Sequence, residues 1–496
     1  MIRDRSSRAA RISGICAVAF LLLFSSRNSL AQYKPTDSVP EEWKQGFSSI
    51  TEAQSKEWLS VLAGPEFSGR GTGQDGFVKA AFFVAGKLAE YGFEPIGDEG
   101  TYFQNLPFAR IGPNLEASTL VIGDQTWRAS DGIGYVSFNA NSLLEKPVVF
   151  VSGKGQNLAL KDDVNLQDKI VVVNTENTGL SFLRPILQKQ PAAIIQVVDK
   201  APENRSRVIR GGDSVPGGNV RIQVTREMAK KIAAECHVDA SLVEPRSEDG
   251  TDSAVTEVNM TIDLRLIEQP IKVPNVVGWL EGSDPNLKDE YIVIGAHLDH
   301  LGARDGNVYP GADDNASGST AILQIAKALH ENPVRPKRSV LYLAFAAEEI
   351  GLVGSKYYCD HPLKPLDKCV CMLNIDMIGR NEETPEEKAT ENESSIHLVG
   401  TKVQSDELHE AVLEANKYVG FDFEYDEDRV NGRSDQASFA AKGIPVTFLF
   451  GGFNPYYHQP SDKLDGINYS KIANAARLNY ICIFLAAERG RFELNK

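Results

Sequence analysis

From about residue 272 onward, continuously apolar runs of strand length alternate with amphipathic segments of helix length. The predicted strands are YIVIGAH, SVLYLAFAA, VCMLNIDMIG, SIHLVG and IPVTFLFG. The predicted helices are SGSTAILQIAKALHEN, GLVGSKYYCD, SDELHEAVLEANKYVG and SKIANAARLNYICIFLAAE. Strands that alternate with helices predict a mostly parallel sheet with helices on both faces.

The pattern before residue 272 is different. Residues 49–92 predict helices, the clearest being GFVKAAFFVAGKLAEYG, where apolar residues recur at three and four until Gly92. From 116 to 266, short β-rich runs are separated by Gly and Asn, which predicts a separate small domain. The glycines of GTGQDG, Gly71–Gly76, match a dinucleotide-binding pattern, but no strand precedes them, and we interpret them as a turn.

Composition narrows the class of protein and its partners. A chain of 496 residues is too long for one ordinary core and predicts two or three domains. A hydrophobic content of 42% excludes a disordered chain. Lys+Arg 52 minus Asp+Glu 67 gives a net charge of −15, which argues against nucleic acid or an anionic membrane as a general partner.

The N-terminus has the pattern of a secretory signal peptide. Four arginines precede the apolar run Ile15–Phe24, and small residues around Ala31 suggest cleavage there. The alternative is a membrane anchor, but the run is too short to span a bilayer well. Cys16 lacks the small neighbours of a lipoprotein cysteine. We therefore predict that residues 1–31 are removed and that the mature protein is periplasmic or secreted, without a membrane attachment.

Five cysteines remain in the mature chain: Cys236, Cys359, Cys369, Cys371 and Cys482. An exported protein can form disulfides, and Cys359 with Cys369 or Cys371 is the predicted pair because these residues flank one loop. The odd number leaves at least one thiol free, for which we expect a buried Cys482. A zinc site at Cys369 and Cys371 is disfavoured because no second cysteine pair follows at zinc-finger spacing.

Carboxylates and imidazoles follow nearly every predicted strand of the C-terminal region, where ligands bind in such sheets. Each alone has a structural explanation, such as a helix N-cap for Asp313 and Asp314. Together they predict a zinc site with nitrogen and oxygen ligands. Five ligands supply three per metal if one carboxylate is shared, which favours two metals over one. The candidates are His297, Asp313, Glu349, Asp376 and His458.

Two glutamates, Glu348 and Glu349, stand side by side after one predicted strand. Neighbouring side chains of an extended segment point to opposite sides, so that both cannot easily bind one metal. We expect one to bind metal and the other to act as general base. Asp299 is placed to accept the second N–H of His297 and to fix its tautomer.

The motifs GAHLDHLG, PGADDNASG, AFAAEEIGLVGS, NIDMIGR and YYHQPSD occur in the order found in the M28 family of zinc metallopeptidases, which the chain resembles over nearly its whole mature length. The resemblance implies an α/β fold of the zinc aminopeptidase and phosphorylase-hydrolase type, with a mixed, mostly parallel sheet between helices. It also implies three parts of the mature chain. These are residues 32–115 as the N-terminal part of the peptidase domain, 116–266 as a β-rich insert similar to a protease-associated (PA) domain, and 267–496 as the catalytic domain. The insert would cover part of the cleft and limit substrate size, or be purely structural.

The resemblance also implies a role for each site residue. His297 and Asp376 would bind one zinc, Glu349 and His458 the other, and Asp313 would bridge them. Metal-bound hydroxide would attack the peptide carbonyl with Glu348 as general base, and Asp299 would orient His297. The peptide bond between Asp313 and Asp314 would be cis, as is frequent in the family.

The function implied is an exported two-zinc aminopeptidase that releases residues from the N-termini of peptides or proteins. Three alternatives stay open: a carboxypeptidase or dipeptidase of the same fold, a one-zinc glutaminyl cyclase, and a receptor without catalysis. Cobalt or manganese also suits such ligands. In the loop NGRSDQAS, Gln436 stands where relatives often have His. The candidates for substrate contact are Arg433, Asp435, Tyr456 and Tyr457.

Overall fold

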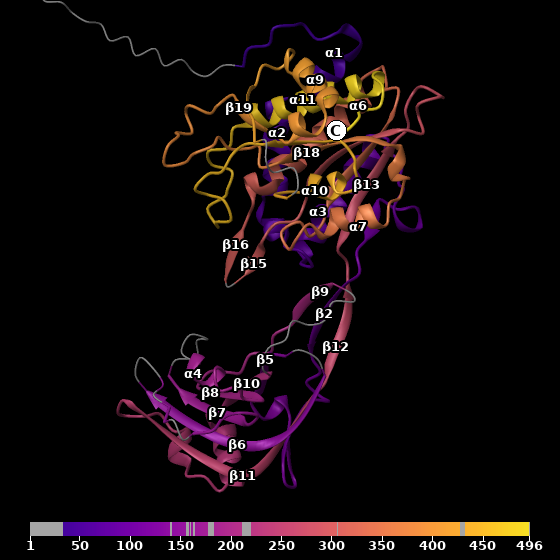
Figure 1. The fold of residues 1–496 in the computed structure, drawn as a ribbon. Coiled ribbons are helices and arrows are strands. Elements are labelled where there is room, and N and C mark those ends of the chain that lie inside the picture. Colours follow the sequence, from indigo (N-terminus) through magenta and orange to yellow (C-terminus); the bar gives the residue numbers. More distant parts are fainter. Residues whose placement is uncertain are drawn as a thin grey trace, which may run out of the picture.

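The protein is represented by a computed structural model that describes residues 33–495 apart from 139–140, 155–157, 159, 162–163, 177–182, 211–219, 305 and 427–431. The predicted signal peptide lies outside the described residues. Figure 1 shows two bodies, each built on its own sheet, that are joined by a narrow three-stranded sheet. None of the helices in the described part of the chain is both long enough and apolar enough to cross a membrane.

The first body contains an eight-stranded mixed sheet in the order β1-β13-β17-β14-β18-β21-β19-β20. The central strands β17, β14, β18 and β21 are parallel to one another. Strand β13 pairs antiparallel with β1 and β17, whereas β19 pairs antiparallel with β21 and parallel with β20. The predicted mixed, mostly parallel sheet is therefore confirmed. The strands are β1 (Phe103–Asn105), β13 (Pro274–Leu280), β14 (Tyr291–His297), β17 (Ser339–Phe345), β18 (Cys369–Asp376), β19 (Ser395–Val399), β20 (Asp422–Glu424) and β21 (Val446–Phe450).

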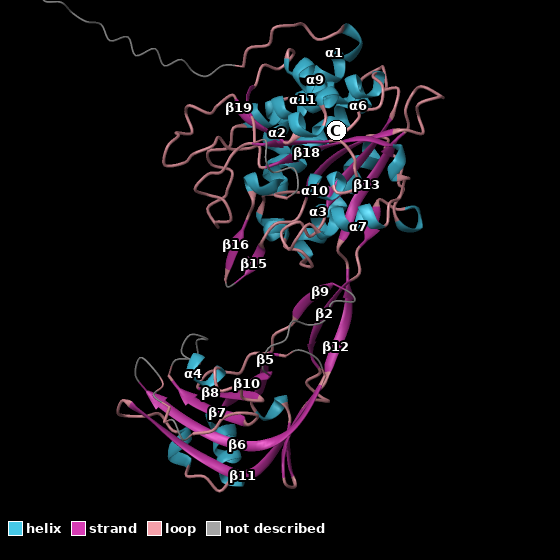
Figure 2. Ribbon diagram, in the orientation of Figure 1, coloured by secondary structure: helices cyan, strands magenta, loops and turns pink. Residues whose placement is uncertain are grey.

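Helices cover both faces of this sheet, as the cyan ribbons of Figure 2 show. Ile292 and Ile294 of β14 belong to one apolar core and Tyr291 and Val293 to another, because alternate side chains leave a strand on opposite faces. The first core includes residues of α1 (Glu41–Ser49), α2 (Glu52–Leu62), α3 (Asp75–Glu90), α6 (Gly318–Glu331), α9 (Asp406–Asn416) and α11 (Tyr469–Glu488). The second includes residues of α7 (Val353–Asp360) and α10 (Gln436–Ala440). Because helices cover both faces of the sheet, a ligand can approach it at the ends of the strands.

The second body is an eight-stranded sheet in the order β4-β3-β11-β6-β7-β8-β10-β5, with an apolar core of its own. Strands β6, β7, β8 and β10 are parallel to one another. All of these strands fall within the predicted insert 116–266, whose likeness to a PA domain stays a prediction. The elements are β3 (Thr119–Ile122), β4 (Gln125–Trp127), β5 (Ile133–Ser137), β6 (Ser142–Lys154), β7 (Ile170–Thr175), α4 (Arg184–Leu187), β8 (Ala193–Val198), β10 (Val220–Thr225), α5 (Arg226–Glu235) and β11 (Gly250–Leu264).

A three-stranded sheet, β12-β2-β9, joins the two bodies and is called the stalk below. It consists of β2 (Phe108–Pro113), β9 (Arg207–Arg210) and β12 (Leu266–Ile271). The hairpin of β15 (Gly302–Arg304) and β16 (Asn307–Tyr309) projects from the first body toward the second in Figure 1. The short helix α8 (Thr401–Gln404) precedes α9.

The predicted disulfide is wrong. Cys236, Cys359, Cys369, Cys371 and Cys482 are all buried with free thiols. Cys359 of α7 and Cys369 of β18 both pack into the second apolar core, and the Cys369 thiol donates to the carbonyl oxygen of Cys371 at 3.5 Å. The cysteines therefore act as small apolar core residues and do not form a disulfide across the loop.

Candidate metal centre

The carboxyl ends of the parallel strands bring the candidate residues together. The chain passes from β14 to β17 on one side and then to β18 on the other side of β14, which makes a switch point where ligands bind in such sheets. His297 is the last residue of β14, and Asp376 is the last residue of β18. Glu348 and Glu349 follow β17, and His458 follows β21. Side chains that are far apart in the sequence therefore meet at one edge.

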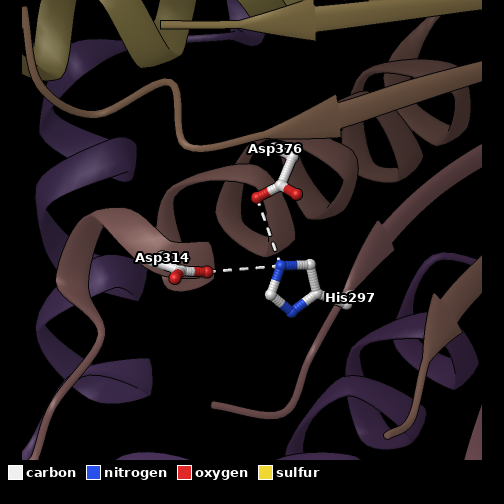
Figure 3. A group of neighbouring side chains, drawn as sticks. All are labelled: His297, Asp314 and Asp376. Atoms are coloured by element: carbon white, nitrogen blue, oxygen red, sulfur yellow. Dashed lines mark hydrogen bonds and ion pairs between the residues drawn. The ribbon is translucent and has the colours of Figure 1, made fainter. Parts of the chain in front are cut away.

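The first cluster consists of His297, Asp314 and Asp376, shown in Figure 3. His297 Nε2 lies 3.1 Å from Asp376 Oδ1 and 3.3 Å from Asp314 Oδ1. All three side chains are buried. Burial by itself lowers the pKa of His297, but Asp376, Glu348 and Asp314 raise it well above its ordinary value. This imidazole is thus surrounded by negative charge.

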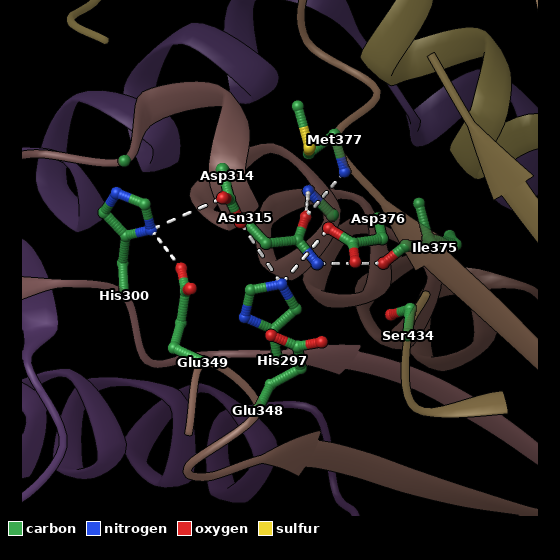
Figure 4. Close-up of polar contacts among 12 residues, drawn as sticks. His297, His300, Asp314, Asn315, Glu348, Glu349, Ile375, Asp376, Met377 and Ser434 are labelled. Carbon is green, nitrogen blue, oxygen red and sulfur yellow. Dashed lines mark hydrogen bonds and ion pairs between the residues drawn. The ribbon is translucent and has the colours of Figure 1, made fainter. Parts of the chain in front are cut away.

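The second cluster shares Asp314 with the first. His458 Nε2 lies 3.1 Å from Asp314 Oδ2 and 3.1 Å from Glu349 Oε2. His300 Nδ1 lies 2.5 Å from Glu349 Oε1 and 3.6 Å from Asp314 Oδ2. Figure 4 shows His300 with both carboxylates. The two oxygens of Asp314 therefore face two separate groups of imidazole and carboxylate side chains.

The spacing of these atoms fits zinc. Two ligand atoms at about 2.0–2.1 Å from one tetrahedral zinc lie roughly 3.3 Å apart. Around Asp314, the separations to His297 and His458 are 3.3 Å and 3.1 Å. Burial raises the pKa of the Asp314 carboxyl, but the three histidines outweigh it and hold that pKa well below the ordinary range. A buried carboxylate that attracts positive charge from two sides is a suitable bridge between two cations.

The predicted bridging residue was one position too early. The carboxylate between the two clusters is that of Asp314, and Asp313 belongs to neither cluster. Before α6 the chain passes through an irregular turn, in which Gly311 has a φ of 57° and Asp314 has φ −101° and ψ 98°. The cis peptide bond joins Asp314 to Asn315, and not Asp313 to Asp314 as expected from the resemblance.

Asp313 instead fastens the turn to the loops around it. Its carboxylate accepts hydrogen bonds from the N–H groups of Gly379 at 2.6 Å and Arg380 at 3.1 Å, and from Asn454 Nδ2 at 3.0 Å. Gly379 and Arg380 follow β18, and Asn454 precedes His458 by four residues. The fully buried Asp313 thus links the loops that carry Asp376 and His458.

Two other residues hold the Asp314 turn. Asp462 Oδ2 accepts the backbone N–H groups of Asp313 at 2.9 Å and Asp314 at 3.2 Å. Asn315 donates from Nδ2 to the carbonyl oxygen of Ile375, and its Oδ1 accepts the N–H of Met377, on either side of Asp376 (Figure 4). The turn that carries Asp314 is therefore fixed relative to Asp376.

Asp299 contacts His297 in a different way from that predicted. The Asp299 main-chain carbonyl oxygen lies 3.1 Å from His297 Nδ1, whereas its carboxylate is 3.9 Å away. The carboxylate accepts the N–H of Glu348 at 3.0 Å and the hydroxyl of Thr72 at 2.8 Å. Asp299 consequently fixes the His297 ring through its backbone and the Glu348 backbone through its side chain.

Glu348 faces a cavity of about 190 Å³ beside the two clusters. Burial and the carboxylates of Asp435, Asp376 and Asp299 raise the pKa of Glu348, while His297 lowers it. A carboxylate with a raised pKa at the edge of such a site is suited to exchanging protons with a ligand. The cavity is lined by His297, Asp314, Glu348, Asp376, Met377, Arg433, Phe448, Phe450, Phe453, Tyr457 and His458.

Of the four residues predicted to contact substrate, Arg433 and Tyr457 line this cavity and Tyr456 and Asp435 do not. The Tyr456 ring lies 4.3 Å from the Arg380 guanidinium, and Asp435 is fully buried. Gln436, at the position where relatives often have His, accepts a hydrogen bond from Asn374 and donates one to the carbonyl oxygen of Gly432. Gln436 thus supports the loop that carries Arg433.

Sequence reasoning missed His300, although it stands in the same strand-end motif as His297 and only three residues later.

A larger cavity of about 470 Å³ lies in the insert at the carboxyl ends of β7 and β8. None of the groups of metal-ligating side chains found in the described residues lies there. We therefore place the chemistry at the smaller cavity.

Comparison with known proteins agrees with this placement. The model of peptidase family M28 matches residues 275–481, a range that contains both clusters. Aminopeptidase YwaD of Bacillus subtilis (strain 168) is 29% identical over 252 residues, which are 49% of this chain and 51% of the relative. Leupeptin-inactivating enzyme 1 of Streptomyces exfoliatus is 31% identical over 216 residues, which are 39% of this chain and 44% of the relative. The matched segments thus cover about half the length of these relatives.

A solved structure extends the similarity of fold to almost the whole chain. The aminopeptidase from Aneurinibacillus sp. strain AM-1 matches with a TM-score of 0.50 and 19% sequence identity. The match covers 92% of this chain and 98% of that one. The similarity therefore includes the insert as well as the body that carries the clusters.

Proposed function

Because residues 275–481 belong to peptidase family M28, we propose that the chain is an exported two-zinc aminopeptidase. The observation that carries the proposal is the pair of ligand groups that share the Asp314 carboxylate. One shared carboxylate between two groups favours two metals over one, and hence a peptidase over a one-zinc cyclase. The intact Glu348 beside both groups argues against a receptor that has lost catalysis.

The residues of each cluster supply the ligands. His297, Asp314 and Asp376 would hold one zinc, and Asp314, Glu349 and His458 the other. His300 would hold the Glu349 carboxylate in place, because its nearest contact is the 2.5 Å one to Glu349 Oε1. Partners of this kind fix the orientation of a ligand. Asp313 has no place in this set because its carboxylate is occupied by three N–H donors.

When bound, the zinc ions would polarise the scissile carbonyl and lower the pKa of the attacking water. Glu348 takes a proton from that water and delivers it to the leaving amine nitrogen, so that one peptide bond is exchanged for a carboxylate and a free amine. Its backbone N–H is held by Asp299 at 3.0 Å, which fixes where the carboxylate can swing. A general base of this kind contributes about 10²–10⁴-fold to the rate.

The lining of the cavity favours the N-terminus of a peptide over its C-terminus. Asp314 and Asp376 would be occupied as zinc ligands, which leaves Glu348 as the carboxylate of this lining that bears no metal. A carboxylate there suits an ammonium group and opposes a second carboxylate. The Arg433 guanidinium also lines the cavity, but Asp426 Oδ2 accepts a hydrogen bond from its Nη1 at 2.6 Å. That pairing makes Arg433 a poor anchor for a substrate carboxylate and argues against a carboxypeptidase.

A chromogenic panel of aminoacyl amides tests the proposal, with each compound offered with a free and with an acetylated N-terminus to zinc-loaded protein. We expect hydrolysis of the free-amine compounds only, together with two zinc ions per chain by elemental analysis. Equal cleavage of the acetylated compounds contradicts an aminopeptidase. A content near one zinc per chain contradicts the shared bridge.

Export rests on the sequence of residues 1–31 and has its own test. We expect the full-length chain, expressed in a bacterium with its own N-terminus, to be recovered outside the cytoplasm and to begin near residue 32. N-terminal sequencing of the recovered protein gives the cleavage point. An uncleaved N-terminus in a membrane fraction would instead support the anchor.

A further inference from the structure

The fully buried Arg70 is the starting point. Its side chain has no exposed surface, although a buried charge is costly unless its donors are satisfied. Arg70 ends the short helix η1 (Pro65–Arg70) and has a φ of 53°. It lies directly before the glycine-rich turn GTGQDG, for which the proposed function has no role.

The guanidinium connects the two loops that carry metal ligands. Arg70 Nε donates to the carbonyl oxygen of Leu298 at 2.9 Å, next to His297. Arg70 Nη1 and Nη2 donate to the carbonyl oxygens of Pro310 at 2.8 Å and Gly311 at 2.9 Å, at the start of the turn that carries Asp314. Nη1 also donates to the carbonyl oxygen of Leu62 at 2.7 Å, where α2 ends. The planar guanidinium therefore fixes the distance between the two loops and anchors both of them to the end of α2.

The backbone of Arg70 adds a further contact to the first loop. The N–H of His300 donates to the Arg70 carbonyl oxygen at 3.2 Å. The positive charge of the Arg70 side chain also interacts with the carboxylates of the proposed metal site. The pKa of Arg70 is lowered to about 10, because the effect of burial outweighs that of Asp314, Asp462, Asp299 and Glu349, which raise it. Arg70 is thus a fixed positive charge that partly offsets the crowded carboxylates.

Thr72, two residues later, is connected to the backbone of Glu348 through Asp299. Its hydroxyl donates to Asp299 Oδ2 at 2.8 Å, and the other oxygen of Asp299 accepts the N–H of Glu348. The stalk holds the same turn from outside, because Arg110 Nη2 donates to the Gly73 carbonyl oxygen at 3.0 Å and Val208 and Ile271 pack against Gly73. The turn is thereby fixed between the stalk and the site.

We propose that the segment Arg70–Thr72 is a positioning element of the catalytic site. Arg70 sets the separation of the His297 and Asp314 loops, and Thr72 sets the Glu348 backbone through Asp299. This inference rests on the proposed two-zinc site. It assigns a role to residues that lie far from the metal ligands in the sequence.

Three variants of the full chain test this inference: Arg70→Lys, Arg70→Met and Thr72→Val. Lysine keeps the charge but cannot reach carbonyls on both loops, because an ammonium is a compact donor rather than a fork. Arg338→Lys is the matched control. Arg338 is also buried, and it donates to Glu290 and to the carbonyl oxygens of Ala486 and Arg489, none of them in the proposed site. Circular dichroism establishes a temperature at which each metal-free variant is folded.

The readouts are the zinc dissociation constants, measured against a chromophoric chelator, the absorption spectrum of the cobalt-loaded protein, and kcat and KM. We expect Arg70→Lys and Arg70→Met to weaken zinc binding about 10–100-fold, as for other residues that orient ligands, and to change the cobalt spectrum. Arg338→Lys should leave both unchanged. Thr72→Val should keep two zinc ions and lower kcat about tenfold with little change in KM.

Folded Arg70 variants with the zinc affinities and cobalt spectrum of the wild type overturn the inference. If neither Arg70 variant folds, Thr72→Val decides: a kcat equal to that of the wild type overturns the inference, and a lower kcat with two zinc ions bound supports it. Failure of the proposed function is distinguishable, because it shows in the wild type as a lack of zinc or of free-amine hydrolysis.

Discussion

The same substitution, Glu to Gln, should have different effects at the adjacent residues Glu348 and Glu349. Glu349 is in contact with His300 at 2.5 Å and with His458 at 3.1 Å. Glu348 shares the cavity with His297, and the hydrogen bond that fixes it to Asp299 comes from its backbone. Glu348→Gln therefore removes the proton acceptor and leaves the ligand contacts in place. Glu349→Gln removes a ligand and a charge-assisted hydrogen bond.

The expected magnitudes follow from these contacts. For Glu348→Gln, kcat should fall about 10²–10⁴-fold, the range for loss of a general base. At 1.36 kcal/mol per factor of ten, this is about 2.7–5.4 kcal/mol of transition-state stabilisation. KM should change little, and two zinc ions should remain. For Glu349→Gln, the zinc content should fall toward one per chain. The lost hydrogen bond to a charged group should also cost about 1.5–3 kcal/mol of stability.

Steady-state kinetics on the best free-amine substrate and elemental analysis of the dialysed variants measure these effects. Both substitutions keep the side-chain volume, so that each variant is the control of the other. A Glu348→Gln variant with more than a tenth of the wild-type kcat would refute the assignment of Glu348 as general base. A Glu349→Gln variant that keeps two tightly bound zinc ions would refute the ligand role of Glu349.

Three further predictions concern the bridge, the bound metal and the metal-free protein. Asp314→Asn should abolish activity and lower the zinc content, whereas Asp313→Asn should keep two zinc ions and lower the melting temperature. Elemental analysis gives the zinc content and calorimetry the melting temperature. Loss of zinc from Asp313→Asn with retention of two zinc ions by Asp314→Asn would contradict this prediction. Removal of metal by a chelator should lower the free energy of unfolding by about 2.7 kcal/mol for each zinc ion, relative to protein with free zinc at 100 times the dissociation constant of that site, and added zinc should restore it in thermal unfolding. In metal-free protein the raised pKa of Glu348 means that the folded state holds this proton more tightly than the unfolded state. Its stabilising effect is therefore present at pH below the ordinary value of about 4.3 and is lost as the pH rises above it, so that the urea-unfolding stability of Glu348→Gln should fall less steeply with pH than that of the wild type.

The sequence by itself determined which elements form and which ends of strands carry chemistry. Short, mostly apolar runs such as YIVIGAH, alternating with amphipathic segments of helix length, predict buried strands in a sheet covered on both faces, and β14 is one of them. Once the strands are parallel, the residues that follow them must meet at one edge. The grouping of His297, Glu349, Asp376 and His458 therefore follows from the sequence alone.

The tertiary structure decided what depends on irregular backbone and on packing between distant segments. Side-chain direction has a period in a helix or a strand, but none in the turn before α6, and so Asp313 and Asp314 could not be told apart from their spacing. Contacts made through the main chain, such as those of Arg70 with Leu298 and Gly311, leave no pattern of residue types to read. The free thiols were likewise decided by packing, because the nearness of two cysteines along a loop does not fix where their side chains pack.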